Sequence, residues 1–139
     1  MRIRYVDHLA GIAAVQLEGF FVGWPNPPSP ATHLELLNRS DAIELALDDD
    51  DRARVVGFIT AISDGVLSAC IPLLEVLPEC RGNGIGRELV KRMLARLQHL
   101  YMVDLSCDAR LQPFYASLGF RPATGMMLRN YEFQSGARR

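Results

Sequence analysis

Three glycines within five residues join an apolar segment to an amphipathic helix, and this junction constrains the fold more than any other feature of the chain. The apolar segment is Val66–Leu77, and Gly82, Gly84 and Gly86 follow it closely. Across residues 84–100 apolar side chains recur at intervals of three and four, which predicts a helix with one buried face. A strand that leads through a short turn into such a helix indicates a sheet covered by helices.

The start of this helix has the properties of an anion site. The first N–H groups of a helix lack partners and carry partial positive charge, and glycines let that backbone approach a phosphate closely. Arg81 and Arg87 could add cationic donors at the rim. A triphosphate loop would need GxxxxGK[ST], which is absent, and the GxGxG spacing departs from the dinucleotide fingerprint GxGxxG. From these residues alone, a turn that only connects strand and helix remains an alternative.

The remaining patterns predict a fold of the α+β class, with a central, mostly antiparallel sheet flanked by helices. Residues 23–30 contain four of the eight prolines, which predicts an irregular loop there. Pro72 lies inside the longest apolar segment and lacks a ladder donor, so we expect an edge, a bulge or a splay at that point. We expect helices at residues 7–20, 31–38, 84–100 and 111–118, and strands at 3–6, 43–47, 54–62, 66–77, 101–106 and 126–133.

Composition and charge exclude several classes of partner. The 139 residues suit one domain, residues 1–139, and 49% of them are hydrophobic. A formal charge of −1 provides no general attraction to nucleic acid or to an acidic membrane. The chain shows no secretory signal and no membrane-spanning segment, and its three cysteines lack metal-like or paired spacing. We therefore expect a cytoplasmic protein that binds neither nucleic acid nor membrane.

Two linked segments resemble the GNAT N-acetyltransferase superfamily. Residues 76–89 read V-x-P-x-x-R-G-x-G-I-G-x-x-L, which is similar to the loop that binds the pyrophosphate of acetyl-CoA in that family. Residues 105–108, followed by the FYxxLGF pattern of residues 114–120, resemble its second signature. The resemblance covers residues 41–133, and residues 1–40 match in outline as the variable acceptor-side region. It implies a GNAT fold that uses acetyl-CoA as cosubstrate and no metal.

The resemblance also implies which residues hold acetyl-CoA. The backbone of the central strand would pair with the pantetheine arm, as an added strand does at an open sheet edge. The glycine-rich turn would hold the pyrophosphate, and Asp108 would contact the cofactor arm or cap a helix. The implied cofactor-binding residues are Leu74, Glu75, Val76, Arg81, Gly82, Asn83, Gly84, Ile85, Gly86, Arg87 and Asp108.

Two residues are candidates for acid and base chemistry. Tyr115 matches the family's frequent general acid, which protonates the departing thiolate, although a tyrosine on an amphipathic helix can also be a core aromatic. Glu75 is the only acid in the central strand and a candidate base, with Asp64 and Asp104 as weaker candidates. The histidines form no metal or triad pattern, so we interpret them as structural or surface residues.

The expected reaction is direct attack of a primary amine on acetyl-CoA, with a small aryl or alkyl amine favoured as acceptor. Phe20, Phe21 and Trp24 could form an apolar wall for the acceptor, or could cap the core. A protein N-terminal or lysine acetyltransferase and a non-catalytic acetyl-CoA-binding regulatory module are the alternatives. Exposed sheet edges would permit a homodimer.

Overall fold

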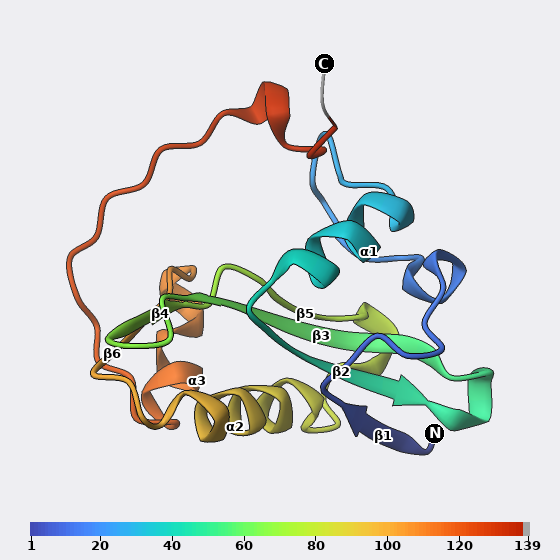
Figure 1. Ribbon diagram of the computed structural model, residues 1–139, viewed down its shortest axis with the longest axis horizontal. Coiled ribbons are helices and arrows are strands. Elements are labelled where there is room, and N and C mark those ends of the chain that lie inside the picture. The colour runs from blue at the N-terminus through green and yellow to red at the C-terminus, as the bar shows by residue number, and fades with distance from the viewer. Residues whose placement is uncertain (138–139) are drawn as a thin grey trace.

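A six-stranded sheet lies between two helices in the computed structural model, which describes residues 1–137 (Figure 1). α1 (Pro30–Arg39) covers one face of the sheet and α2 (Ile85–Leu97) covers the other. The strand order is β1-β2-β3-β4-β6, and β5 also pairs with β3. The strands are β1 (Ile3–Val6), β2 (Ala42–Asp48), β3 (Arg54–Ser63), β4 (Ser68–Cys70), β5 (Leu74–Val76) and β6 (Met102–Asp104).

The sheet is mostly antiparallel, as the sequence predicts, and only β4 and β6 pair in parallel. The helices predicted at residues 31–38 and 84–100 are present as α1 and α2, which flank the sheet. Ser29 caps α1 by accepting a hydrogen bond from the Thr32 amide, and Pro30 occupies the first helical position, where no N–H is needed. Within residues 1–137 no helix combines the length and the apolar character that crossing a membrane requires.

The central strand β3 builds the core on both faces of the sheet. Gly57 faces α2, where an added Cβ would lie 3.1 Å from Ile85 Cγ2 and from Leu89 Cδ1. The next residue, Phe58, points to the other face, and its ring centroid lies 4.3 Å from that of His33 on α1. The absence of a side chain at residue 57 therefore lets α2 approach the sheet closely.

Pro72 divides the predicted strand of residues 66–77 into β4 and β5. β4 pairs with β6 on its outer side, in the register Ala69 to Val103, whereas within residues 1–137 β5 pairs with β3 alone. The predicted splay is thus confirmed. Because no strand of the described chain pairs with β5 on the side away from β3, one edge of its backbone is open.

The predicted helix at residues 7–20 is wrong. Only a short 3-10 helix, η1 (Ala14–Leu17), forms in this region. Gly11 and Gly19 adopt φ values of +76° and +97°, which interrupt a right-handed helix on both sides of η1. Gln16 instead fixes the segment by donating a hydrogen bond to the carbonyl of Ala53, and Leu17 is buried.

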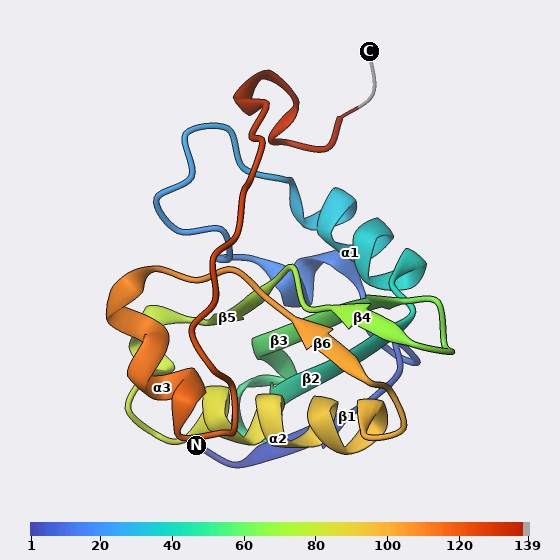
Figure 2. The same cartoon turned by 90° about the vertical axis from the view of Figure 1, so that its left-hand side faces the viewer.

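The predicted closing strand at residues 126–133 is also absent. After η4 (Ala109–Leu111) and α3 (Gln112–Ala116), the chain leaves the body of the protein as an extended, unpaired segment, residues 121–130, which we call the arm. A 3-10 helix, η5 (Tyr131–Phe133), follows it. The arm curves past β6 and α3 in a wide arc and ends near the loop that precedes α1 (Figures 1 and 2).

Candidate acetyl-CoA site

The glycine-rich turn gathers free backbone donors at the start of α2. Gly82 and Gly84 both lie in the left-handed region, with φ of +81° and +77°, and α2 begins directly after Gly84. In the described part of the chain, none of the N–H groups of residues 82–87 donates an intramolecular hydrogen bond. A Cβ at either glycine would meet no atom within 4 Å, so the turn is open on that side. Free N–H groups at a helix start are chemically suited to binding a phosphate.

The side chains of the turn shape it or flank it. Asn83 Nδ2 donates to the carbonyls of Cys80 and Arg81, at 3.0 and 3.3 Å, and so closes the turn from within. Arg81 Nε donates to the carbonyl of Val76 at 3.1 Å, which holds this guanidinium beside the end of β5. The predicted role of Asn83 would therefore be served by its backbone, since its side chain is already engaged.

Arg87 connects the start of α2 to the end of α3. Its guanidinium donates to Ser117 Oγ at 2.9 Å, and Ser117 in turn donates to the carbonyl of Phe114 at 2.6 Å. A Cβ on Gly86 would lie 3.9 Å from Phe114 Cζ, so the first turn of α2 packs closely against α3. The structure thereby places α3, which carries Tyr115, against the start of α2 and its glycine-rich turn.

The backbone of β5 presents the groups that the resemblance implies for pantetheine. In the antiparallel ladder with β3, the carbonyl of Leu73 accepts from Thr60 and the amide of Leu77 donates to Val56. Backbone groups of an antiparallel strand alternate between its two edges, so those of Leu74 and Val76 point away from β3. Both residues therefore lie on the open edge.

Glu75 holds the loop in front of β5 rather than standing free. Its Oε1 accepts from the amide of Phe21 at 2.8 Å, and its Oε2 accepts from the amide of Val22 at 3.3 Å. Phe21 has a left-handed φ of 62°, a strained conformation for a residue with a side chain. The carboxylate therefore stabilises a turn that the sequence alone would not favour.

The aromatic residues of this loop divide between core and surface. Phe20 and Phe21 are buried against His33 and Phe58, so they cap the core. Trp24 is 36% exposed, and its ring centroid lies 4.9 Å from that of Phe21. Of these three aromatic residues, Trp24 is therefore the one whose ring is partly exposed.

Tyr115 lies in the wall of a cavity of about 810 Å³. Its ring is 9% exposed and packs edge-on against Phe114 and Phe120, with centroids 5.0 and 5.7 Å away. Burial, with a smaller contribution from Cys107, raises the pKa of the phenol above its ordinary value. The hydroxyl therefore keeps its proton at neutral pH, as a general acid must.

The other acidic candidates have different environments. Asp64 Oδ1 accepts from the amides of Val66, Leu67 and Ser68, which lowers the pKa of the carboxyl to about 2 and makes it part of the β3–β4 turn. Asp104 lines the cavity beside Tyr115. Asp108 precedes η4, but its side chain makes no capping hydrogen bond and instead lies 3.7 Å from Arg110. Its side chain is exposed.

Two features of the site were not evident from the sequence. The bond between Glu75 and Phe21 joins residues 54 positions apart, and no local pattern signals it. His33 is 1% exposed, and neither of its ring nitrogens has a hydrogen-bond partner in the described residues. Burial lowers its pKa to about 4.

Within residues 1–137 there is no group of three or more His, Cys, Asp or Glu side chains placed to hold a metal ion.

A splayed sheet with an open strand edge, leading into a glycine-rich helix start, is the arrangement of the acetyltransferase fold. The family model described as "Acetyltransferase (GNAT) domain" matches residues 41–122. The chain belongs to this family, and the resemblance predicted from its two signatures is confirmed.

Known proteins similar to this chain differ in how much of it they cover. A crystal structure of a Deinococcus radiodurans R1 protein designated an acetyltransferase is 47% identical, with a TM-score of 0.94 over 99% of this chain and 94% of the other. An uncharacterised N-acetyltransferase, ycf52 of Pyropia yezoensis, is 29% identical over 71% of this chain and 58% of its own length. Serotonin N-acetyltransferase 2 of Oryza sativa is 36% identical over 48% of this chain and 34% of its own. The chain thus spans little more than half the length of the Pyropia relative.

Proposed function

We propose that this chain transfers the acetyl group of acetyl-CoA to a primary amine by direct attack. The observation that carries this proposal is the position of the N–H groups of residues 82–87, which have no partner among the described residues, beside the open backbone edge of β5. A pyrophosphate and a peptide-like pantetheine arm are joined in one molecule in acetyl-CoA, and they match these two features in chemistry. The bound molecule would supply the thioester.

The residues of the chain have separate tasks in this reaction. The backbone of residues 82–87 binds the pyrophosphate, with Arg81 and Arg87 at its flanks, and Leu74 and Val76 orient the pantetheine arm through their backbone groups. Asp108 contacts the pantetheine arm of the bound acetyl-CoA. The amine nitrogen attacks the thioester carbonyl and loses a proton to solvent water as the amide bond forms. Tyr115 donates its proton to the departing thiolate, since its raised pKa keeps it protonated until then, and the phenolate takes a proton back from solvent.

The acceptor side favours a small aryl or alkyl amine. Trp24 offers an exposed aromatic face, and Glu75 fixes the adjoining turn at β5. The 36% identity to a rice protein named a serotonin N-acetyltransferase, an enzyme for an aryl alkyl amine, supports the same acceptor class. We assign Glu75 to positioning, because both of its oxygens already accept backbone hydrogen bonds.

Calorimetry with acetyl-CoA tests the donor half of this proposal. In Gly84→Glu a carboxylate would enter the open side of the turn, and we expect at least a tenfold loss of affinity. Gly65→Glu is the matched control, because Gly65 also has a left-handed φ, of +73°, and open space at its Cβ, but lies in the β3–β4 turn. Equal affinities for the two variants, or no binding by the unaltered protein, would contradict the proposal.

A panel of amines, with release of CoA thiol as readout, tests the acceptor half. We expect turnover with aryl alkyl amines and little with peptides that present a lysine or a free N-terminus. Turnover with the peptides alone would instead favour a protein acetyltransferase. Binding of acetyl-CoA without turnover on any amine would identify a regulatory module.

A further inference from the structure

Two consecutive hydrogen bonds lead from the glycine-rich turn to the backbone beside Tyr115. Arg87 Nη1 donates to Ser117 Oγ at 2.9 Å, and Ser117 Oγ donates to the carbonyl oxygen of Phe114 at 2.6 Å. That carbonyl belongs to the peptide group whose nitrogen is the backbone nitrogen of Tyr115. The proposed reaction uses Arg87 and Tyr115 but assigns no task to Ser117, which joins them.

The helix that carries Tyr115 has little support of its own. α3 contains five residues, too few for a helix that is stable by itself, and no side chain caps its first turn. Among the described residues, the bond from Arg87 to Ser117 is the one hydrogen bond between α2 and residues 112–120. The position of α3 on α2 therefore depends on this bond and on the packing of Phe114 near Gly86.

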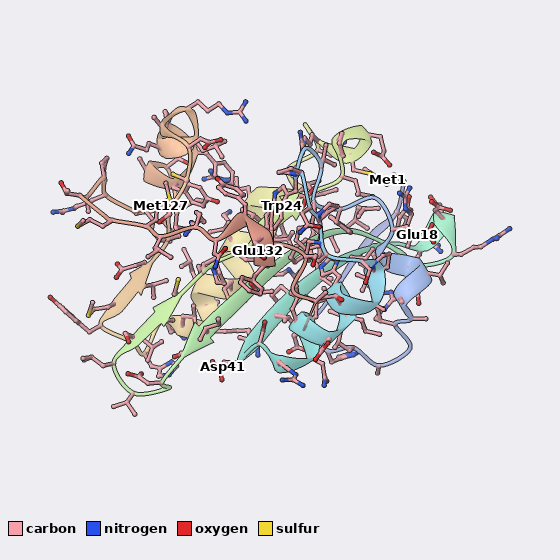
Figure 3. The ribbon with its side chains drawn as sticks, turned by 90° about the horizontal axis from the view of Figure 1, so that it is seen from above. Met1, Glu18, Trp24, Asp41, Met127 and Glu132 are labelled. Atoms are coloured by element: carbon pink, nitrogen blue, oxygen red, sulfur yellow. The ribbon has the colours of Figure 1, made fainter. Side chains whose placement is uncertain are left out.

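Part of the surface of α3 borders the cavity of about 810 Å³ instead of packed side chains. Tyr115 and Ala116 line this cavity from α3, and Met127 lines it from the arm. Seen from above, Met127 lies at the margin of the molecule, on the side of α3 and β6 (Figure 3). The cavity thus separates α3 from the arm, which makes the contact of α3 with α2 more important for the position of Tyr115.

We propose that Ser117 is a positioning residue that connects pyrophosphate binding at Arg87 with the placement of the general acid Tyr115. The inference rests on the proposed function, because it needs a pyrophosphate in the glycine-rich turn. A guanidinium has five N–H donors, so Arg87 can keep its bond to Ser117 while other N–H groups face the phosphate. The bound anion would fix the guanidinium, and Ser117 would then fix the peptide group before Tyr115.

The chemistry of the two side chains gives these hydrogen bonds one direction. Arginine has no acceptor, so Ser117 Oγ must accept from Arg87, and its single proton is left for the carbonyl of Phe114. A hydroxyl that accepts from a cation becomes a stronger donor. Threonine has the same hydroxyl and could replace the serine, whereas alanine would break both bonds.

Steady-state kinetics of three single variants provides the first test. Ser117→Ala should lower kcat about fivefold, the usual weight of one such hydrogen bond, and leave the affinity for acetyl-CoA within twofold. Ser117→Thr should keep at least half of the unaltered kcat. Ser40→Ala is the matched control, because Ser40 also ends a helix, α1, and its Oγ donates to the carbonyl of Leu36 at 2.8 Å. It should leave kcat unchanged.

The same substitution in a Tyr115→Phe chain separates positioning from general support of the fold. That chain has no phenolic proton to place, so Ser117→Ala should lower its kcat by less than twofold. A residue that only stabilised the fold would lower kcat by the same factor with and without the phenol. Such an equal factor would overturn the proposal, and so would an unchanged kcat in Ser117→Ala.

Amide NMR with saturating coenzyme A tests the connection without turnover. The amide of Gly84 reports binding in the turn, and the amide nitrogen of Tyr115 reports changes at the carbonyl that precedes it. We expect both signals to shift in the unaltered chain, and the Tyr115 shift to fall by at least half in Ser117→Ala while the Gly84 shift is retained. A full Tyr115 shift in Ser117→Ala would overturn the role of Ser117 and leave the proposed function intact. No shift at Gly84 in the unaltered chain would instead contradict the proposed function, and this inference with it.

Discussion

His33 should make the stability of this protein fall as the pH is lowered below about 6.5. The ring is buried among Phe20, Phe21 and Phe58, and its nitrogens have no partner in the described residues. Its pKa is about 4 in the folded protein, below the 6.5 that is ordinary for a histidine. Between these two values the unfolded chain binds the proton and the folded chain does not, so the stability present above pH 6.5 is progressively lost in acid.

The magnitude follows from the two pKa values. Linkage gives a loss of about 2 kcal/mol at pH 5 and about 3 kcal/mol at pH 4, relative to pH 7.5. Urea unfolding of the unaltered protein and of His33→Leu at these three pH values would measure it. The variant replaces the imidazole by an apolar group in an aromatic environment, so we expect its stability to depend on pH less steeply by these amounts.

Comparing His33→Leu with the unaltered protein separates the effect of His33 on stability from the effects of other titrating groups. Glu44 is buried beside Arg96, and burial raises the pKa of its carboxyl, so its contribution to stability has the opposite sign and is common to both proteins. An equal dependence in His33→Leu and the unaltered protein would refute the assignment.

Three further predictions concern the site and its support. Tyr115→Phe should lower kcat at least tenfold and leave the affinity for acetyl-CoA within twofold, and unchanged turnover would reject its role as acid. Glu75→Gln should raise KM for an aryl amine about tenfold, because Glu75 positions the turn at Phe21. The fall of kcat/KM at acidic pH should remain in this variant. If that fall disappeared, Glu75 would be the general base. Gly57→Ala should destabilise the protein by about 1 kcal/mol in urea unfolding, since its Cβ would press on Ile85 and Leu89 at 3.1 Å.

The features that the sequence predicted well depend on neighbouring residues. The glycine-rich turn and α2 are encoded by a contiguous pattern, and the break at Pro72 follows from the missing N–H of proline. The predicted helix at residues 7–20 was wrong because spacing alone gave no sign that Gly11 and Gly19 would adopt positive φ. The apolar spacing of residues 7–20 is that of a helix, but packing and the hydrogen bond from Gln16 to Ala53 determine the backbone conformation.

The features that the sequence could not show depend on distant residues. The side chain of Glu75 could be placed in the central strand, yet its partners lie in a loop 54 residues earlier. The closing strand at residues 126–133 had a suitable composition, but a strand needs an edge within reach, and the ends of the arm are fixed elsewhere on the body. Composition alone thus predicted a strand where the chain leaves its own sheet.

Strand alternation at β5 gives residue 75 a connection to both substrates of the proposed reaction. Its backbone neighbours, Leu74 and Val76, lie on the edge where the donor would pair, while its side chain holds the aromatic turn on the acceptor side. A shift of this short strand would therefore move both binding surfaces together. Binding of the donor would therefore change the affinity for the amine, and binding of the amine would change the affinity for the donor. Residue 75 would couple the two.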